Sequence, residues 1–155
     1  MRYTTKSAKE TQRIAAGFAK KIAAKKPGKR AVIIALTGDL GSGKTTFVQG
    51  FARALGVRRR TVSPTFTIMR RYVIPKKSRA FRNGFHSLVH VDAYRVHKPA
   101  ELKIIRFEAW LHDPSAIVLI EWADLIEKKH LRGTHRVRFK HREKSMREVI
   151  TQKSP

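Results

Sequence analysis

The chain carries two short, continuously apolar stretches that predict buried parallel strands. The first covers residues 31–37 and the second covers residues 116–120, and both are rich in β-branched side chains. A third, mostly apolar stretch at residues 87–94 predicts another strand. Residues 66–73 predict a fourth strand, which would pair with the third as an antiparallel hairpin.

Apolar residues at helical spacing predict three helices among these strands. The first follows the N-cap residue Ser7, forms a capping box with Glu10 and ends before Pro27. The second follows the first apolar strand, and the third begins at Pro99 and ends at Asp113. The other expected elements are a basic loop, a short helix and two charged edge strands, at residues 74–87, 123–129, 136–140 and 147–151.

The turn between the first strand and the second helix carries the phosphate-binding pattern G-x-x-x-x-G-K-[ST], from Gly38 to Thr45. Its glycines let the backbone approach a phosphate while the loop N–H groups point inward. Lys44 would set a positive charge against the terminal phosphates, and Thr45 would offer a hydroxyl to Mg²⁺. The flanking strand and helix are the context that this motif requires, so a glycine-rich turn without a ligand is disfavoured.

This order of elements predicts an α/β fold. We expect a P-loop NTPase-like three-layer sandwich with a mixed, mainly parallel central sheet. A length of 155 residues fits a single domain that spans residues 1–155.

Two acidic residues are candidate catalytic groups. Glu121 closes the second apolar strand, where it would hold Mg²⁺ or position the attacking water. Asp92 lies in a largely apolar strand, where an acid is uncommon unless it is paired or bound to a metal. His90 shares its face of the strand, and a hydrogen-bonded structural histidine is the favoured interpretation. Residues 63–67 are a candidate switch that senses the γ-phosphate, with an ordinary turn as the alternative.

Composition adds a strong positive charge to this picture. The chain has 35 Lys and Arg against 11 Asp and Glu, a formal net charge of +24. Such a surface attracts polyanions, with RNA as the first candidate and a solvated surface without a dedicated partner as the alternative. The absence of cysteine excludes disulfides and thiolate metal sites and suits the cytoplasm. No apolar run reaches membrane-spanning length, so we expect no membrane partner.

Four segments in this order resemble the TsaE family of bacterial P-loop ATPases. They read TGDLGSGKTT at 37–46, SPTFT at 63–67, HVDAYR at 90–95 and IEWAD at 120–124. The resemblance implies an ATP-hydrolysing accessory protein for threonylcarbamoyladenosine modification of tRNA. It further implies TsaD and TsaB partners, tRNA nearby through that complex, and weak hydrolysis by the isolated chain.

The resemblance also implies roles for particular residues. Thr45 and Glu121 would hold Mg²⁺, and the catalytic residues would be Asp92, Glu121 and Lys44. The chain departs from the family in lacking a glycine between Lys103 and Phe107, in its basic loop at 74–87 and in its basic segment from Lys128. ATP would be bound by residues that include the whole phosphate loop: Thr11, Gly38, Asp39, Leu40, Gly41, Ser42, Gly43, Lys44, Thr45, Thr46 and Trp122.

Two other functions are alternatives to an ATPase. A small-molecule or nucleoside kinase would share the loop and Mg²⁺, with Asp92 as the base and residues 76–82 as a lid. A basic RNA-binding protein would carry a vestigial nucleotide site. Only a kinase forms a phosphorylated acceptor, and absence of ATP binding would favour the RNA-binding protein. Arg95 is a candidate for a catalytic arginine supplied by the chain itself.

Overall fold

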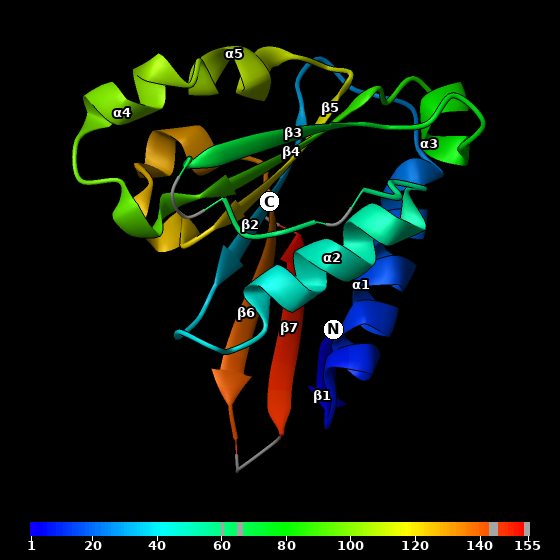
Figure 1. Ribbon diagram of the computed structural model, residues 1–155, viewed down its shortest axis with the longest axis vertical. Coiled ribbons are helices and arrows are strands. Elements are labelled where there is room, and N and C mark those ends of the chain that lie inside the picture. The colour runs from blue at the N-terminus through cyan, green and yellow to red at the C-terminus, as the bar shows by residue number, and fades with distance from the viewer. Residues whose placement is uncertain (60, 65–66, 143–145, 154–155) are drawn as a thin grey trace.

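Seven strands form one sheet in the computed structural model, which describes residues 1–59, 61–64, 67–142 and 146–153 (Figure 1). The strands are β1 (Arg2–Thr5), β2 (Val32–Thr37), β3 (Met69–Val73), β4 (Ser87–Asp92), β5 (Ala116–Glu121), β6 (His135–His141) and β7 (Arg147–Lys153). The helices are α1 (Ala8–Ala23), α2 (Lys44–Ala54), α3 (Arg79–Arg82), α4 (Pro99–Ile104) and α5 (Phe107–His112), with 3₁₀ turns at Ala93–Arg95, Ala123–Leu125 and Lys128–Leu131.

The sheet has a parallel centre and antiparallel borders. Its strand order is β1-β7-β6-β2-β5-β4-β3. Strands β6, β2, β5 and β4 run parallel, whereas β7, β1 and β3 are antiparallel to their neighbours. This confirms the mixed, mainly parallel sheet, the two parallel apolar strands and the β3–β4 hairpin. It also brings the carboxyl ends of β2, β4 and β5 to one edge of the sheet.

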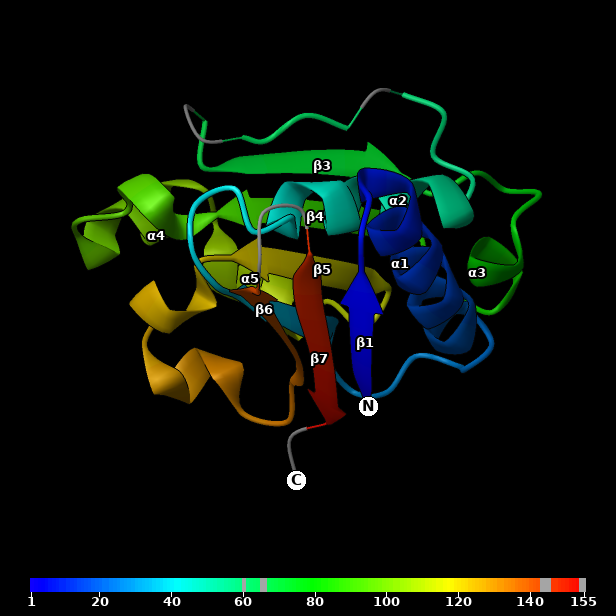
Figure 2. The ribbon, with the colours of Figure 1, turned by 90° about the horizontal axis from the view of Figure 1, so that it is seen from below.

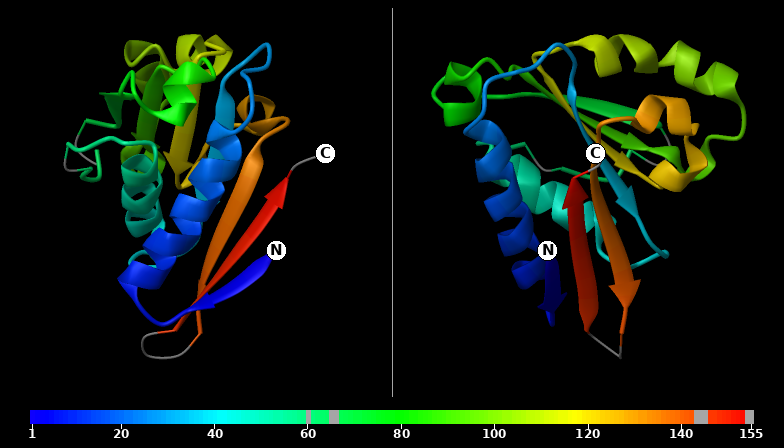
Figure 3. Two further views of the ribbon diagram at one scale, coloured as in Figure 1. Left: turned by 90° about the vertical axis from the view of Figure 1, so that its right-hand side faces the viewer. Right: turned by 180° about the vertical axis from the view of Figure 1, so that it is seen from behind.

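Each face of the central sheet is covered by a separate hydrophobic cluster. On β2, the side chains of Ile34 and Leu36 pack with α1 and α2, whereas Ile33 and Ala35 pack on the opposite face with Phe107 of α5. Alternation of side chains along a strand produces this division. Helices α1 and α2 lie together beside the sheet (Figure 3), and the three layers of the predicted sandwich are confirmed. No helix among the described residues combines the length and apolar character needed to cross a membrane.

Helix α1 begins as predicted. The Ser7 side chain accepts from the Glu10 backbone N–H (3.2 Å), and the Glu10 carboxylate accepts from the Lys6 N–H (2.7 Å). Helix α2 crosses α1 closely at Gly50, where a Cβ atom would come within 2.5 Å of the Gln12 Cα. This close packing fixes the direction of α2, whose N-terminus carries the phosphate loop.

The expectation of two C-terminal edge strands is wrong. Strand β6 lies between β7 and β2, and β7 lies between β1 and β6 (Figure 2). The edges are β1, which the sequence pattern did not reveal, and β3. The edge prediction came from the many charged residues of β6. Two of them, Arg136 and Arg138, are exposed on one face of the strand, but the alternating Val137 and Phe139 are buried on the other face. A strand that is charged on one face can still lie inside a sheet.

Four other predicted elements also differ from the structure. The helix expected over 99–113 breaks at Arg106, which adopts φ 52° and ψ 40°, the left-handed conformation that favours glycine. The basic loop at 74–87 contains the one-turn helix α3, and the helix expected at 123–129 is replaced by 3₁₀ turns. Strand β3 begins at Met69 rather than at residue 66, which lies outside the described residues.

Candidate functional site

The phosphate loop connects β2 to α2 and reaches the carboxyl edge of the sheet (Figure 1). Gly38 has φ 137°, and a Cβ atom there would collide with the carbonyl oxygen of Phe139. Gly43 is the N-cap of α2 with φ 104°, and no side chain caps the helix. The first turn of α2 contains no acidic residue either. The backbone N–H groups of this helix end are therefore available to an anion, which the helix dipole also favours.

Lys44 is held inside the loop. Its ammonium group donates to the carbonyl oxygens of Gly38 (2.6 Å) and Asp39 (2.9 Å). The same group lies 3.9 Å from the centroid of the Trp122 ring, a cation–π contact. Burial lowers the pKa of Lys44, and the nearby carboxylates of Glu121 and Asp92 oppose that shift. The loop carbonyls and the Trp122 ring thus fix the orientation of the cation.

Glu121 joins the loop to the sheet through two hydrogen bonds. One carboxylate oxygen accepts from the Thr45 hydroxyl (2.9 Å), and the other lies 2.8 Å from Nε2 of His90. The side chains of Glu121 and His90 are buried. His90 therefore fixes the orientation of the carboxylate that faces Thr45, and the prediction of a hydrogen-bonded structural histidine is confirmed.

Asp92 stands beside Glu121, because these two residues are paired in register at the ends of β4 and β5. Its carboxylate accepts from the Ser63 hydroxyl (2.6 Å) and from the backbone N–H of Tyr94 (3.1 Å). The first contact ties the candidate switch directly to a candidate catalytic acid. Residues 65 and 66 of that switch lie outside the described residues.

An aromatic pair forms the wall of the site. The rings of Trp122 and Tyr94 lie 5.0 Å apart at 40°. Trp122 adopts φ 56°, a left-handed conformation that turns the chain sharply after the strand carrying Glu121. The resulting pocket measures about 340 Å³ and is lined by Leu40, Gly41, Ser42, Gly43, Lys44, Thr45, Thr46, Ser63, Asp92, Tyr94, Glu121 and Trp122.

Most of the predicted site residues thus meet in one pocket. Gly38 and Asp39 do not line it, and they contribute the carbonyl oxygens that hold Lys44. Thr11 does not line it either. Its hydroxyl is buried against the Thr5 hydroxyl (3.1 Å), and its methyl group lies behind Gly43. The structure therefore places Thr11 as a support for the loop.

Sequence reasoning missed two residues here. Tyr94 belongs to a recognised segment, but nothing in its pattern indicated that it would face Trp122. Arg147, at the start of β7, lies against the loop, with its Cδ 3.5 Å from the position of a Cβ on Gly43. Among the described residues its buried Nε has no hydrogen-bond partner. A free donor beside a helix N-terminus makes Arg147 a candidate anion contact. The sequence did not single out this residue, because it lies in a segment with many charged residues.

The oxygen atoms at this edge suit Mg²⁺ bound together with a phosphate ligand. The Thr45 hydroxyl and the Glu121 carboxylate are in contact, and Asp92 is adjacent. Within the described parts of the chain, no group of three or more His, Cys, Asp or Glu forms a metal site by itself. Mg²⁺ commonly uses one or two carboxylates and takes its other ligands from substrate phosphates and water. The residues present fit that arrangement.

Comparison with known proteins gives the family of this chain. The model of the family described as "Threonylcarbamoyl adenosine biosynthesis protein TsaE" matches residues 5–149. The chain belongs to the TsaE family. The match includes every predicted site residue, from Thr11 to Trp122, and also Arg147.

TsaE-family relatives support the assignment. A Bacillus subtilis tRNA threonylcarbamoyladenosine biosynthesis protein TsaE is 37% identical over 132 residues, covering 83% of this chain and 70% of the relative. The corresponding Synechocystis protein is 38% identical over 94 residues, covering 59% of this chain and 54% of the relative. The crystal structure of Bacillus subtilis YdiB superimposes with a TM-score of 0.74 and 28% identity, covering all of this chain and 86% of that one.

Proposed function

We propose that this TsaE-family chain binds and hydrolyses Mg-ATP in support of threonylcarbamoyladenosine modification of tRNA, together with TsaD and TsaB partners. The observation that carries the proposal is the contact between the Thr45 hydroxyl and the Glu121 carboxylate (2.9 Å) in the first turn of α2, whose N-terminus no side chain caps. A phosphate loop supplies the anion site, and this pair supplies the ligands for the metal that accompanies a nucleoside triphosphate.

Different residues of the pocket would bind the phosphates, hold Mg²⁺ and orient the attacking water. The α2 N-terminus and Lys44 would bind the phosphates, and Thr45 and Glu121 would hold Mg²⁺, which offsets phosphate charge. Asp92 would accept a hydrogen bond from the attacking water and orient it towards the γ-phosphorus. Ser63 already donates to Asp92, so a rearrangement of the switch around the γ-phosphate would change the acid that orients the water.

Slow hydrolysis by the isolated chain follows from the charges in the pocket. Lys44 is the single cation among the described residues that line it, and Arg147 lies against Gly43 outside that lining. Charge that builds up on the transferred phosphoryl group in the transition state is commonly offset by an arginine, which a partner protein can supply. We therefore expect the TsaD and TsaB partners to complete the site and to raise the turnover rate.

The kinase alternative has less support. A kinase would need a lid, and residues 76–82 were the candidate. Helix α3 lies instead at the C-terminal end of α1, where the Asn83 amide donates to the carbonyl of Ala23 (2.8 Å) and Gly84 abuts Pro27. That position is remote from the phosphate loop in Figure 1. This geometry gives no support to a lid function for residues 76–82.

Two assays test the proposal. Calorimetry with Mg-ATP measures binding, and phosphate release in the presence of purified TsaD and TsaB measures hydrolysis. We expect binding by the isolated chain, slow release alone and faster release with the partners. Transfer of phosphate to a small-molecule acceptor, with no free phosphate released, would instead establish a kinase.

A further inference from the structure

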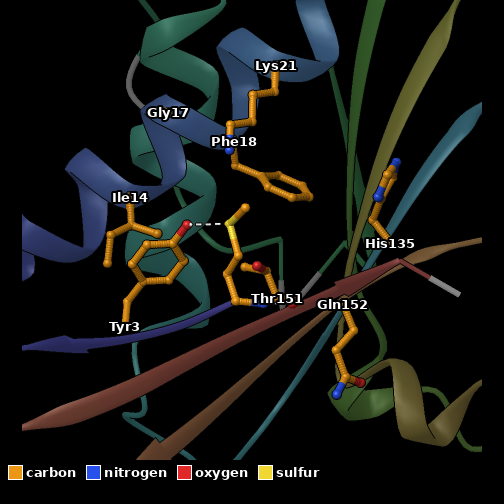
Figure 4. Close-up of a pocket in the computed structure, with 9 residues that line it drawn as sticks. Tyr3, Ile14, Gly17, Phe18, Lys21, His135, Thr151 and Gln152 are labelled. Carbon is orange, nitrogen blue, oxygen red and sulfur yellow. Dashed lines mark hydrogen bonds between the residues drawn. The ribbon is translucent and has the colours of Figure 1, made fainter.

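The two faces of the β6–β7 pair differ in chemistry. On the side of α1 lies a hollow of about 430 Å³ with the apolar side chains of Tyr3, Ile14 and Phe18 around it (Figure 4). On the opposite side lies a larger hollow of about 680 Å³ with five basic residues in its lining. We call this second hollow the basic groove and define it by Lys128, Lys129, Arg132, Arg136 and Arg138.

The fold itself gathers these cations. Arg136 and Arg138 alternate with buried Val137 and Phe139, so both project from one face of β6, about 7 Å apart along the strand. The other three flank the groove from the 3₁₀ turn Lys128–Leu131 and the residue after it. Two separate segments therefore line a common hollow with positive charge, and Asp124 is the single acid among its described lining residues.

Most of this charge does not stabilise the fold. Lys129 pairs with Glu127 at 2.7 Å, and both side chains are largely exposed. Within the described residues, Lys128, Arg132, Arg136 and Arg138 have no carboxylate within 4.0 Å. Grouping like charges in one hollow costs free energy through repulsion. A polyanionic ligand would remove that cost.

We propose that the basic groove binds the phosphodiester backbone of RNA. Its lining contains no aromatic side chain among the described residues, and Ile126, Leu131 and Ile150 add apolar surface. Bases are read mainly by stacking and by hydrogen bonds to their edges, whereas cations contact the backbone regardless of sequence. The groove is thus suited to a folded RNA read by charge and shape. That this RNA is tRNA rests on the proposed function.

The groove adjoins the pocket lined by Lys44, Thr45 and Glu121, which we call the nucleotide pocket. Its lining includes Thr37, which immediately precedes the phosphate loop, and Ala123 and Asp124, which immediately follow Trp122. The two sites therefore share the ends of β2 and β5. An RNA bound in the groove would lie next to the bound nucleotide.

A pair of charge-matched variants tests the inference. The groove variant combines Lys128→Gln, Arg132→Gln, Arg136→Gln and Arg138→Gln. The control variant combines Lys20→Gln, Lys21→Gln, Lys25→Gln and Lys26→Gln, which removes the same charge from exposed positions on and just after α1. The full chain is titrated into fluorescently labelled bulk tRNA across a salt series, and Mg-ATP binding is measured in parallel as a check of folding.

The groove variant should lose at least about tenfold in tRNA affinity at low salt. The negative slope of log K against log salt should become shallower by about three, as expected for four lost phosphate contacts. The control variant should keep most of the affinity and slope, and both variants should bind Mg-ATP like the parent. Equal losses in the two variants would overturn the inference in favour of diffuse charge. Unchanged tRNA binding by the groove variant with lost binding to TsaD and TsaB would make the groove a protein interface instead. Failure of the parent to bind Mg-ATP would contradict the proposed function alone.

Discussion

The nucleotide pocket and the basic groove lie side by side, but they hold their charges in opposite ways. In the pocket Lys44, Asp92 and Glu121 are buried, and each is engaged by hydrogen bonds. In the groove Arg132, Arg136 and Arg138 are exposed, with no ion-pair partner among the described residues. Buried and engaged charges are arranged for one geometry, which phosphoryl transfer requires. Exposed cations tolerate many geometries, which suits a polyanion.

The comparison predicts large effects from single changes in the pocket and graded, salt-dependent effects in the groove. The largest effect should come from Asp92→Asn, which preserves shape but removes the negative charge and replaces one acceptor oxygen with an NH₂ donor, so the water is no longer oriented by a carboxylate. We expect phosphate release to fall by about 100-fold or more, the range for removing a positioned acid or base. Mg-ATP affinity measured by calorimetry should change little. If Asp92→Asn released phosphate at nearly the parental rate, Asp92 would have no role in the mechanism.

Lys44→Ala should have the next largest effect, on binding. Charged hydrogen bonds contribute about 1.5–3 kcal/mol each, so Mg-ATP affinity should drop by about 10- to 100-fold. The matched control is Lys21→Ala, an exposed lysine on α1, which should bind like the parent. Similar calorimetric affinities for the two variants would contradict the assignment of the loop.

Arg147 lies against the phosphate loop and outside the lining of the groove, so it sharpens the distinction between the two regions. We expect Arg147→Gln to weaken Mg-ATP binding by about three- to tenfold, the scale of one partly solvated charged contact. Its tRNA affinity should stay close to parental, because Arg147 faces Gly43 and does not line the groove. The reverse pattern, lost tRNA binding with normal Mg-ATP binding, would move Arg147 to the RNA surface.

The smallest effect concerns pH. Burial lowers the pKa of Lys44, so in the free protein its charge is lost at a lower pH than that of an ordinary lysine. Mg-ATP affinity should therefore decline as the pH rises into the alkaline range. Lys44→Arg keeps its charge there, so its affinity, whatever its starting value, should decline less. Parallel pH profiles for the two proteins would show that this titration does not govern binding.

Sequence periodicity predicted the centre of the fold better than its borders. The apolar stretches at 31–37 and 116–120 correspond to β2 and β5. They were predictable because a strand buried on both faces is a short, continuously apolar run. Strand β1 escaped notice because its four residues are too few to show a period. The break at Arg106 also escaped notice, since a left-handed conformation at a non-glycine residue is imposed by packing rather than by local preference.

The site shows the same division. The motif placed Lys44 and Thr45, the end of an apolar strand placed Glu121, and Asp92 stood out as an acid within an apolar strand. That the two acids lie side by side became clear only from the structure. Contacts between distant segments were not predictable in the same way. The hydrogen bond from Ser63 to Asp92 and the approach of Arg147 to Gly43 depend on sheet order. Sheet order is set by tertiary packing, and local periodicity does not encode it.

The central claim is that Glu121 makes this chain a metal-dependent ATPase completed by its partners. Steady-state phosphate release by the parent and by Glu121→Gln, each with and without TsaD and TsaB, tests that claim most directly. The substitution keeps the size of the side chain and removes its negative charge. We predict slow release by the isolated parent, a rise of at least about tenfold with the partners, and little release by Glu121→Gln in either case despite retained ATP binding. Full activity of Glu121→Gln, or rapid release by the parent without partners, would contradict the account.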